Sequence, residues 1–276
     1  MNRILFIGGG NMARALIAGL RAGVPAAEIE VVDPDATTLE YLQRTFGCTV
    51  SRSISPTVCE ADIVLLAVKP DRIAEVCRDL RDRLTSQVVV SIAAGIDTRA
   101  LSAWLGGHGK VVRAMPNTPA LVRCGVTGLF PAAGIDDLDR REVDAVFASV
   151  GKVIWLADEC LIDAITAVSG SGPAYVFYMI EALTAAGIAL GLDAAYAETA
   201  AAETFRGAIA LLESTRESPS VLRERVTSKG GTTAAALAVF DQRDLSGAIL
   251  DAARSAYGRA NELREAYGTS DARGNA

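Results

Sequence analysis

Two glycine-containing segments far apart in the chain have the composition of anion-binding loops. The first runs from Gly8 to Ala13 and reads Gly-Gly-Gly-Asn-Met-Ala, which fits the pattern GxGxxG/A. In such a loop Gly8 permits a tight turn, and Gly10 lets the backbone come close to a pyrophosphate. Ala13 is small enough for the following helix to pack on the preceding strand, so N–H groups at the helix start face the phosphates.

The second segment runs from Ser228 to Thr233, reads Ser-Lys-Gly-Gly-Thr-Thr and precedes a helical pattern. Backbone N–H groups at a helix start and nearby hydroxyls can together hold a carboxylate. The alternative is a simple helix cap, and the local sequence favours neither. In a third segment, Ser169 to Tyr175, Ser171 is a candidate cap and Pro173 belongs to the first helical turn.

Two charged residues are expected near a dinucleotide bound at the first loop. Asp33 follows that loop by about 20 residues, where a carboxylate accepts hydrogen bonds from ribose hydroxyls and repels a 2′-phosphate, which favours NAD. Its alternative is a turn residue before Pro34. No Arg or Lys lies between Asp33 and Gln43, although Arg14 is able to approach from the first helix. Lys69 is either beside the cofactor or an ordinary solvated lysine.

Alternating strands and helices position these motifs in the first half of the chain. Continuous apolar runs predict strands at residues 3–7, 29–32, 63–68 and 88–94, followed by strands at 110–115 and 152–156. Helical periodicity is present at residues 11–21, 37–46, 73–84 and 136–149. Buried strands that alternate with helices predict an α/β Rossmann-type domain whose parallel sheet is covered on both faces.

The second half of the chain is predicted to be helical. From residue 160 onward the sequence has no convincing strand pattern, and helical periodicity is present at residues 173–190, 194–214, 219–227, 232–241 and 245–266. We therefore predict an α/β domain at residues 1–158 and an all-α domain at residues 159–267. Residues 268–276 are small and polar, which predicts a disordered tail.

Composition excludes several classes of function. The 276 residues carry a net charge of −6 without a basic block, so no nucleic-acid partner is expected. No apolar stretch is long enough for a membrane helix, and the N-terminus does not resemble a secretory signal, so we expect a soluble, cytoplasmic protein without a membrane partner. The single histidine, His108, lies in a glycine turn, and the five cysteines have no CxxC spacing. We therefore predict no metal site and small buried cysteines.

Six segments, taken together, resemble the pyrroline-5-carboxylate reductase family. They are IGGGNMARALIAGL (7–20), LAVKP (66–70), VSIAAGI (90–96), RAMPNTPALV (113–122), AVSGSGPAYVF (167–177) and VTSKGGTTAAAL (226–237). The resemblance implies a Rossmann-type domain followed by a helical-bundle domain for substrate binding and dimerisation. It also implies hydride transfer from NAD(P)H to the C=N bond of 1-pyrroline-5-carboxylate, giving L-proline in the last step of proline biosynthesis. Members of the family are usually homodimers and often decamers.

The resemblance also implies roles for individual residues. Thr233 is expected to hydrogen-bond the ring nitrogen, and Thr233 and Ser228 are the candidate catalytic residues. The expected substrate-binding residues are Ser228, Gly231, Thr232 and Thr233. Together with Asp33, the expected cofactor-binding residues are Gly8, Gly9, Gly10, Asn11, Met12, Ala67, Val68, Lys69, Pro70, Ile92, Ala93, Ala94 and Asn117.

The chain departs from the family pattern at one position, and the alternatives to this function are specific. Lys229 stands where many members have proline, which adds a charge beside the carboxylate loop. Family members often use NADPH whereas Asp33 favours NAD, so the choice between NADP(H) and NAD(H) stays open. A β-hydroxyacid dehydrogenase-like enzyme needs a general acid or base, and the predicted long helices of the second half contain no lysine. A non-catalytic dinucleotide-sensing protein needs no carboxylate loop.

Overall fold

The computed structural model describes residues 3–268, and their contacts divide the chain into two compact units. The first unit contains the residues up to Ser171 together with those from Ser255 onward, and the second contains Gly172–Arg254. The first unit therefore includes segments beyond the predicted boundary at 158/159. Of the predicted tail, Gly268 ends the last helix, and residues 269–276 lie outside the described residues.

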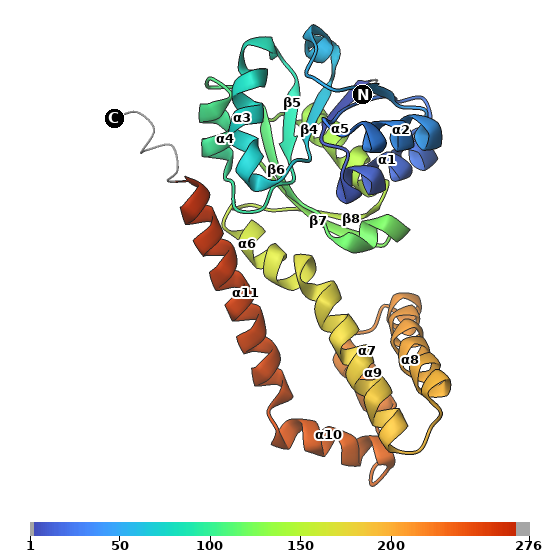
Figure 1. The fold of residues 1–276 in the computed structure, drawn as a ribbon. Helices are drawn as coiled ribbons and strands as arrows, with labels where there is room; N and C mark the ends of the chain where they lie inside the picture. The colour runs from blue at the N-terminus through green and yellow to red at the C-terminus, as the bar shows by residue number, and fades with distance from the viewer. Residues whose placement is uncertain (1–2, 269–276) are drawn as a thin grey trace. The chain divides into compact units, whose positions relative to one another are not determined.

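One sheet forms the centre of the first unit, with strands in the order β3-β2-β1-β4-β5-β6-β7-β8 (Figure 1). The strands are β1 Arg3–Ile7, β2 Glu28–Val32, β3 Thr49–Ser51, β4 Ile63–Leu66, β5 Val88–Ser91, β6 Val111–Met115, β7 Gly125–Pro131 and β8 Gly151–Trp155. All neighbouring strands are parallel except β6 and β7, which are antiparallel. The predicted α/β fold with a parallel sheet is confirmed, and strand β7, which was not predicted from the sequence, runs antiparallel to β6.

The short connection between β6 and β7 explains this reversal. Residues 116–124 join the two strands and include a 3-10 helix, Thr118–Val122. A connection of this length has no room for the crossover helix that parallel neighbours need, so β7 turns back along β6. Two glycines and a terminal proline interrupt β7, and they weaken the strand pattern in the sequence.

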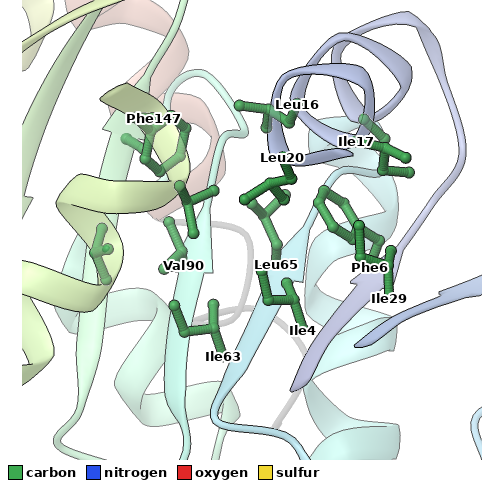
Figure 2. Packing of buried hydrophobic residues seen from close by; sticks show 14 of the residues in the cluster. Ile4, Phe6, Leu16, Ile17, Leu20, Ile29, Ile63, Leu65, Val90 and Phe147 are labelled. Carbon is green, nitrogen blue, oxygen red and sulfur yellow. The ribbon is translucent and has the colours of Figure 1, made fainter. Parts of the chain in front are cut away.

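Helices cover both faces of the sheet, as predicted. They are α1 Asn11–Gly23, α2 Ala36–Phe46, α3 Pro70–Leu80, α4 Thr98–Trp104 and α5 Asp137–Ala148. Helices α1 and α5 share one apolar core with the sheet, and α3 and α4 share the core on the other face (Figures 1 and 2). Figure 2 shows Leu20 of α1 beside Phe6 and Leu65 of the strands. All three side chains are fully buried, and each contributes about 1.5–3 kcal/mol to stability.

Two further segments belong to the first unit because buried charges bind them to the sheet. They are α6 Leu161–Ile165, which continues into a π-helical turn at Thr166–Gly170, and the end of α11 Leu245–Gly268. Asp163 of α6 is 2.9 Å from Arg113 of β6 and 2.9 Å from Arg264 of α11. These ion pairs, with Arg113 and Asp163 almost completely buried, fix both segments against the α/β core.

The second unit consists of helices, as predicted. They are α7 Gly172–Ala189, α8 Ala194–Thr215, α9 Pro219–Arg225, α10 Thr232–Gln242 and the first part of α11. Helices α7 and α8 pack closely where Gly187 meets Ala197, since a Cβ added at Gly187 would lie 3.0 Å from that methyl group. Few side chains of this unit are buried: α7, α9 and α10 contain no buried residue.

Candidate active site

Strand register brings four loops to one edge of the sheet. The final residues of β1, β2, β3 and β4 are paired with one another at the same level of the parallel ladder. The next residue of each strand therefore leaves the sheet in the same row: Gly8, Asp33, Arg52 and Ala67. Ligands of open α/β sheets bind at this carboxyl edge.

The glycine loop after β1 has the geometry of a phosphate cradle. Gly8 has φ +102°, and a Cβ on it would lie 2.6 Å from the carbonyl oxygen of Ala67, so only glycine fits the turn. Gly10 is exposed and begins α1 without a side-chain cap, while a Cβ built on it would have open space on all sides. The first N–H groups of α1 are therefore available to an anion, and the loop fits the pyrophosphate of a dinucleotide.

Asp33 holds this loop in place. Its Oδ2 atom accepts a hydrogen bond of 2.7 Å from the N–H of Gly9, and its Oδ1 atom accepts one of 2.9 Å from the N–H of Asp35. A carboxylate has about four acceptor positions, so two backbone bonds leave room for a ribose hydroxyl. The bond to Asp35 supports the alternative of a turn residue before Pro34, and the bond to Gly9 gives Asp33 a role in shaping the loop that was not predicted.

Arg14 is engaged on the outer side of the loop. Its Nε donates to the carbonyl oxygen of Gly9 at 3.1 Å, and its guanidinium lies 4.7 Å from the ring centroid of Tyr41. A second bond joins Arg14 to the Thr38 hydroxyl. These contacts hold the guanidinium beside the loop and α2, and its approach to a 2′-phosphate stays a prediction.

A cavity of about 780 Å³ lies along the carboxyl edge. Six of the expected cofactor-binding residues line it: Gly8, Gly10, Asp33, Ala67, Val68 and Lys69. It is also lined by residues that the sequence analysis missed, namely Arg52 and Ser53 after β3 and Arg72, Glu75, Asp79 and Arg83 on and after α3. The lining residues follow the ends of β1, β2, β3 and β4, so the cavity extends across all four strand ends. Its arginines, Arg52, Arg72 and Arg83, were not predicted from the sequence to lie there.

The remaining expected cofactor residues lie near this edge without lining the cavity. Gly9, Asn11 and Met12 belong to the loop and the first turn of α1, and Pro70 begins α3. Ile92, Ala93 and Ala94 directly follow β5, whose last residue is paired with the end of β4. These positions are compatible with the predicted roles, which stay predictions.

Asn117 has a clear structural function. The residue is buried after β6, and its Nδ2 donates to the carbonyl oxygen of Ser169 at 2.9 Å. Its Oδ1 accepts a bond of 2.8 Å from the N–H of Val126. Asn117 thus joins the π-helical turn to β7, and contact with a cofactor stays a prediction.

The segment Ser228 to Thr233 forms an uncapped helix start in the second unit. Gly230 has φ +72°, and α10 begins after Gly231, where no side chain caps the helix. A Cβ on Gly231 would lie 2.4 Å from the Ser228 hydroxyl oxygen, so a larger residue there would force the Ser228 side chain to move. No side chain caps α10, so its first N–H groups are available to an anion, and carboxylate binding at this loop stays a prediction. Thr233 is half-buried, whereas Ser228, Lys229 and Thr232 are exposed.

Two other predictions from the sequence are corrected. Ser171 does not cap a helix, because its own backbone is helical and its N–H donates to the carbonyl oxygen of Thr166 at 2.8 Å, closing the π-helical turn.

Cys48 and Cys77 are buried as expected, and burial raises the pKa of Cys77 to about 12. The other cysteines, Cys59, Cys124 and Cys160, are exposed.

Hydrogen bonds at the start of α2 favour the ionised form of the Asp35 carboxylate. Asp35 caps α2, and it accepts hydrogen bonds from the Thr38 hydroxyl and from the N–H groups of Thr37 and Thr38. These bonds lower the pKa of Asp35 below its ordinary value.

Among the described residues no His, Cys, Asp or Glu cluster is suited to a metal ion, and no helix there is long and apolar enough to cross a membrane.

The glycine loop on a mostly parallel sheet, followed by a separate array of helices, defines the class of dinucleotide-binding oxidoreductases with a helical second domain. Residues 3–95 match the family described as NADP oxidoreductase, coenzyme F420-dependent. Residues 159–263 match the family described as pyrroline-5-carboxylate reductase dimerisation. The chain is 44% identical over 268 residues to the pyrroline-5-carboxylate reductase of Pseudomonas aeruginosa, covering 96% of this chain and 98% of that protein.

Solved structures agree with this comparison. A pyrroline-5-carboxylate reductase from Coxiella burnetii is 40% identical and superimposes with a TM-score of 0.90 over 94% of this chain and 97% of its own. The pyrroline carboxylate reductase of Plasmodium falciparum, solved with NADP bound, is 26% identical with a TM-score of 0.83, over 95% of this chain and 98% of its own. This chain belongs to the pyrroline-5-carboxylate reductase family, which confirms the predicted family and order of domains.

Proposed function

We propose that this protein reduces the C=N bond of 1-pyrroline-5-carboxylate with NAD(P)H and releases L-proline. Similarity to curated reductases along almost the whole chain carries this proposal. It is supported by two uncapped helix starts, at α1 and α10, that suit a pyrophosphate and a carboxylate respectively. The bound dinucleotide supplies the hydride for the reduction.

The residues of the first unit are proposed to hold the dinucleotide. The loop from Gly8 to Met12 and the first N–H groups of α1 bind the pyrophosphate, with Gly10 as the point of closest approach. Asp33 accepts a hydrogen bond from a ribose hydroxyl while it keeps the loop in shape. Lys69 lines the same cavity and adds a positive charge beside the anionic cofactor.

The residues of the second unit are proposed to hold the substrate. The N–H groups at the start of α10, together with the hydroxyls of Ser228 and Thr232, bind the carboxylate. Thr233 hydrogen-bonds the ring nitrogen and orients the C=N bond. A protonated cyclic imine is already electrophilic, so its reduction depends on positioning more than on a strong acid, and a site without histidine suits it.

The second unit is proposed to form a homodimer with the same unit of another copy. Six large apolar side chains of this unit are each at least 50% exposed: Phe177, Tyr178, Leu190, Tyr196, Ile209 and Phe240. Apolar groups on this scale mark protein–protein interfaces, and the match to a dimerisation family supports the same conclusion. Assembly of dimers into a decamer and a cytoplasmic location are further parts of this proposal.

Turnover measured with both cofactors tests the function. The full-length protein is expected to oxidise NADPH or NADH only when pyrroline-5-carboxylate is present, with proline as the product detected by chromatography. Folded protein that turns over neither cofactor contradicts the proposal. A higher kcat/KM for a β-hydroxy acid than for the imine favours the dehydrogenase alternative instead.

A further inference from the structure

The cavity at the carboxyl edge contains cationic side chains that differ in whether they are already paired. Arg72 forms an ion pair of 3.0 Å with Glu75, and the Nε of Arg83 donates to the carbonyl oxygen of Asp79 at 3.0 Å. Within residues 3–268, the side chains of Arg52 and Lys69 form neither an ion pair nor a hydrogen bond with the protein. These two side chains are therefore the cations of the cavity that are available to a ligand.

Strand order places the two available cations on opposite sides of the glycine loop. Lys69 follows β4, on one side of β1, whereas Arg52 follows β3, beyond β2 on the other side. Parallel strands are about 4.8 Å apart, so the chain leaves β3 about 10 Å from the point where it leaves β1. A dinucleotide with its pyrophosphate at the first loop and its adenosine ribose at the end of β2 directs the ribose 2′ position toward β3.

The turn that carries Arg52 is preformed. The Ser51 hydroxyl donates to the carbonyl oxygen of Ser53 at 2.8 Å, and it accepts from the N–H of Ser53 at 3.3 Å. The N–H of Asp33 donates to the carbonyl oxygen of Ser51 at 3.1 Å, which ties the end of β2 to this turn. Arg52 thus stands next to Asp33 in the row of loops, on a backbone that is held at both sides.

We propose that Arg52 binds the 2′-phosphate of NADP(H) and makes this protein prefer NADP(H) to NAD(H). The inference rests on the proposed function, because it assumes the dinucleotide lies along this edge. A 2′-phosphate carries close to two negative charges at neutral pH, and a guanidinium binds it through two charge-assisted hydrogen bonds. Asp33 alone favours NAD, but a cation on the neighbouring strand end outweighs one carboxylate whose oxygens already accept two backbone N–H groups.

Isothermal titration of the full-length protein with NADP⁺ and NAD⁺ separates this proposal from the catalytic one. The wild type is expected to bind NADP⁺ at least about tenfold more tightly than NAD⁺. Arg52→Gln is expected to raise the ratio of the Kd for NADP⁺ to that for NAD⁺ by about tenfold or more, as loss of a charge-assisted bond does. The wild-type preference is also expected to fall when the pH is lowered through about 6, where the phosphate gains a proton.

Arg72→Gln is the matched control, because it removes the same charge from the same cavity at a residue already paired with Glu75. It is expected to change the ratio less than twofold. Equal effects of the two variants, or a wild type that prefers NAD⁺, overturn the assignment of Arg52. A wild type that binds neither dinucleotide overturns both the assignment and the proposed function, whereas binding without imine reduction contradicts the function alone.

Discussion

Replacement of Asp163 by alanine is expected to destabilise the first unit strongly. The Asp163 carboxylate is 1% exposed and faces two guanidinium groups, those of Arg113 and Arg264, each at 2.9 Å. Glu159 supplies the second negative charge, 3.7 Å from Arg113, so that two cations and two anions balance. Asp163→Ala leaves a net positive charge buried beside β6, where Arg113 is only 2% exposed.

The expected loss follows from what remains buried. Removal of one partner from a buried ion pair costs about 3–5 kcal/mol, because the other charge is left without compensation. For a unit of this size, about 2–4 °C of Tm accompanies each kcal/mol, which predicts a fall of roughly 6–20 °C. Asp163→Asn keeps the shape and one hydrogen-bond acceptor, so a smaller fall is expected.

Thermal unfolding at a fixed protein concentration measures this effect, since oligomerisation makes Tm depend on concentration. Glu40→Ala is the matched control, because Glu40 pairs with Arg44 at 3.4 Å on the surface of the same unit, with side chains 69% and 79% exposed. Exposed pairs contribute little, so its Tm is expected to change by less than about 2 °C. Equal shifts for Asp163→Ala and Glu40→Ala would refute the argument that buried charge balance holds this unit together.

Three other substitutions test the site and the assembly. Gly8→Ala is expected to lower the free energy of unfolding by at least about 1 kcal/mol and to abolish dinucleotide binding, because the φ of +102° at Gly8 and the Ala67 carbonyl exclude a Cβ. Gly10→Ala is the control: since φ at Gly10 is −68°, this variant should keep the stability of the wild type and raise only the Kd for the dinucleotide. Thr233→Ala is expected to lower kcat/KM at least fivefold, about 1 kcal/mol of transition-state binding, and Thr233→Ser to restore most of it; an alanine variant with normal kinetics rejects the role of Thr233. Phe177→Asp puts a charge at a position on α7 where the side chain is 66% exposed, and sedimentation velocity should show a smaller species than the wild type, shifted toward the monomer. An unchanged sedimentation coefficient would exclude Phe177 from the interface.

Periodicity in the sequence was sufficient for most of the fold because buried strands and amphipathic helices leave regular apolar patterns. The strands at 63–68 and 88–94 were predicted too long, since their last residues stay apolar after the chain leaves the sheet at Leu66 and Ser91. Strand β3, Thr49–Ser51, was missed because three residues are too few to establish a period. Because β3 was not predicted, the position of Arg52 at the end of a strand and in the cavity was missed as well.

Some parts of the candidate site could likewise be predicted from the sequence, and others could not. The glycine loop was predictable because each of its positions has a local steric reason that the sequence displays, as Gly8 illustrates. The partners of Asp33 were not predictable, because its bond to the N–H of Gly9 joins residues 24 positions apart through the pairing of β1 with β2. The pairing of Arg113 with Asp163 was overlooked for a related reason: the two residues are 50 positions apart, and only the folded sheet brings their charges together.

The return of the chain from the helical unit to the sheet has a consequence for biosynthesis. Leu263, which packs on Gly95, and Arg264, which pairs with Asp163, are among the last described residues to be translated. A nascent chain that has not yet passed Ser255 contains every strand of the sheet but lacks the second cation for Asp163. The sheet unit of this reductase therefore completes its charge balance only after the entire helical unit has been translated.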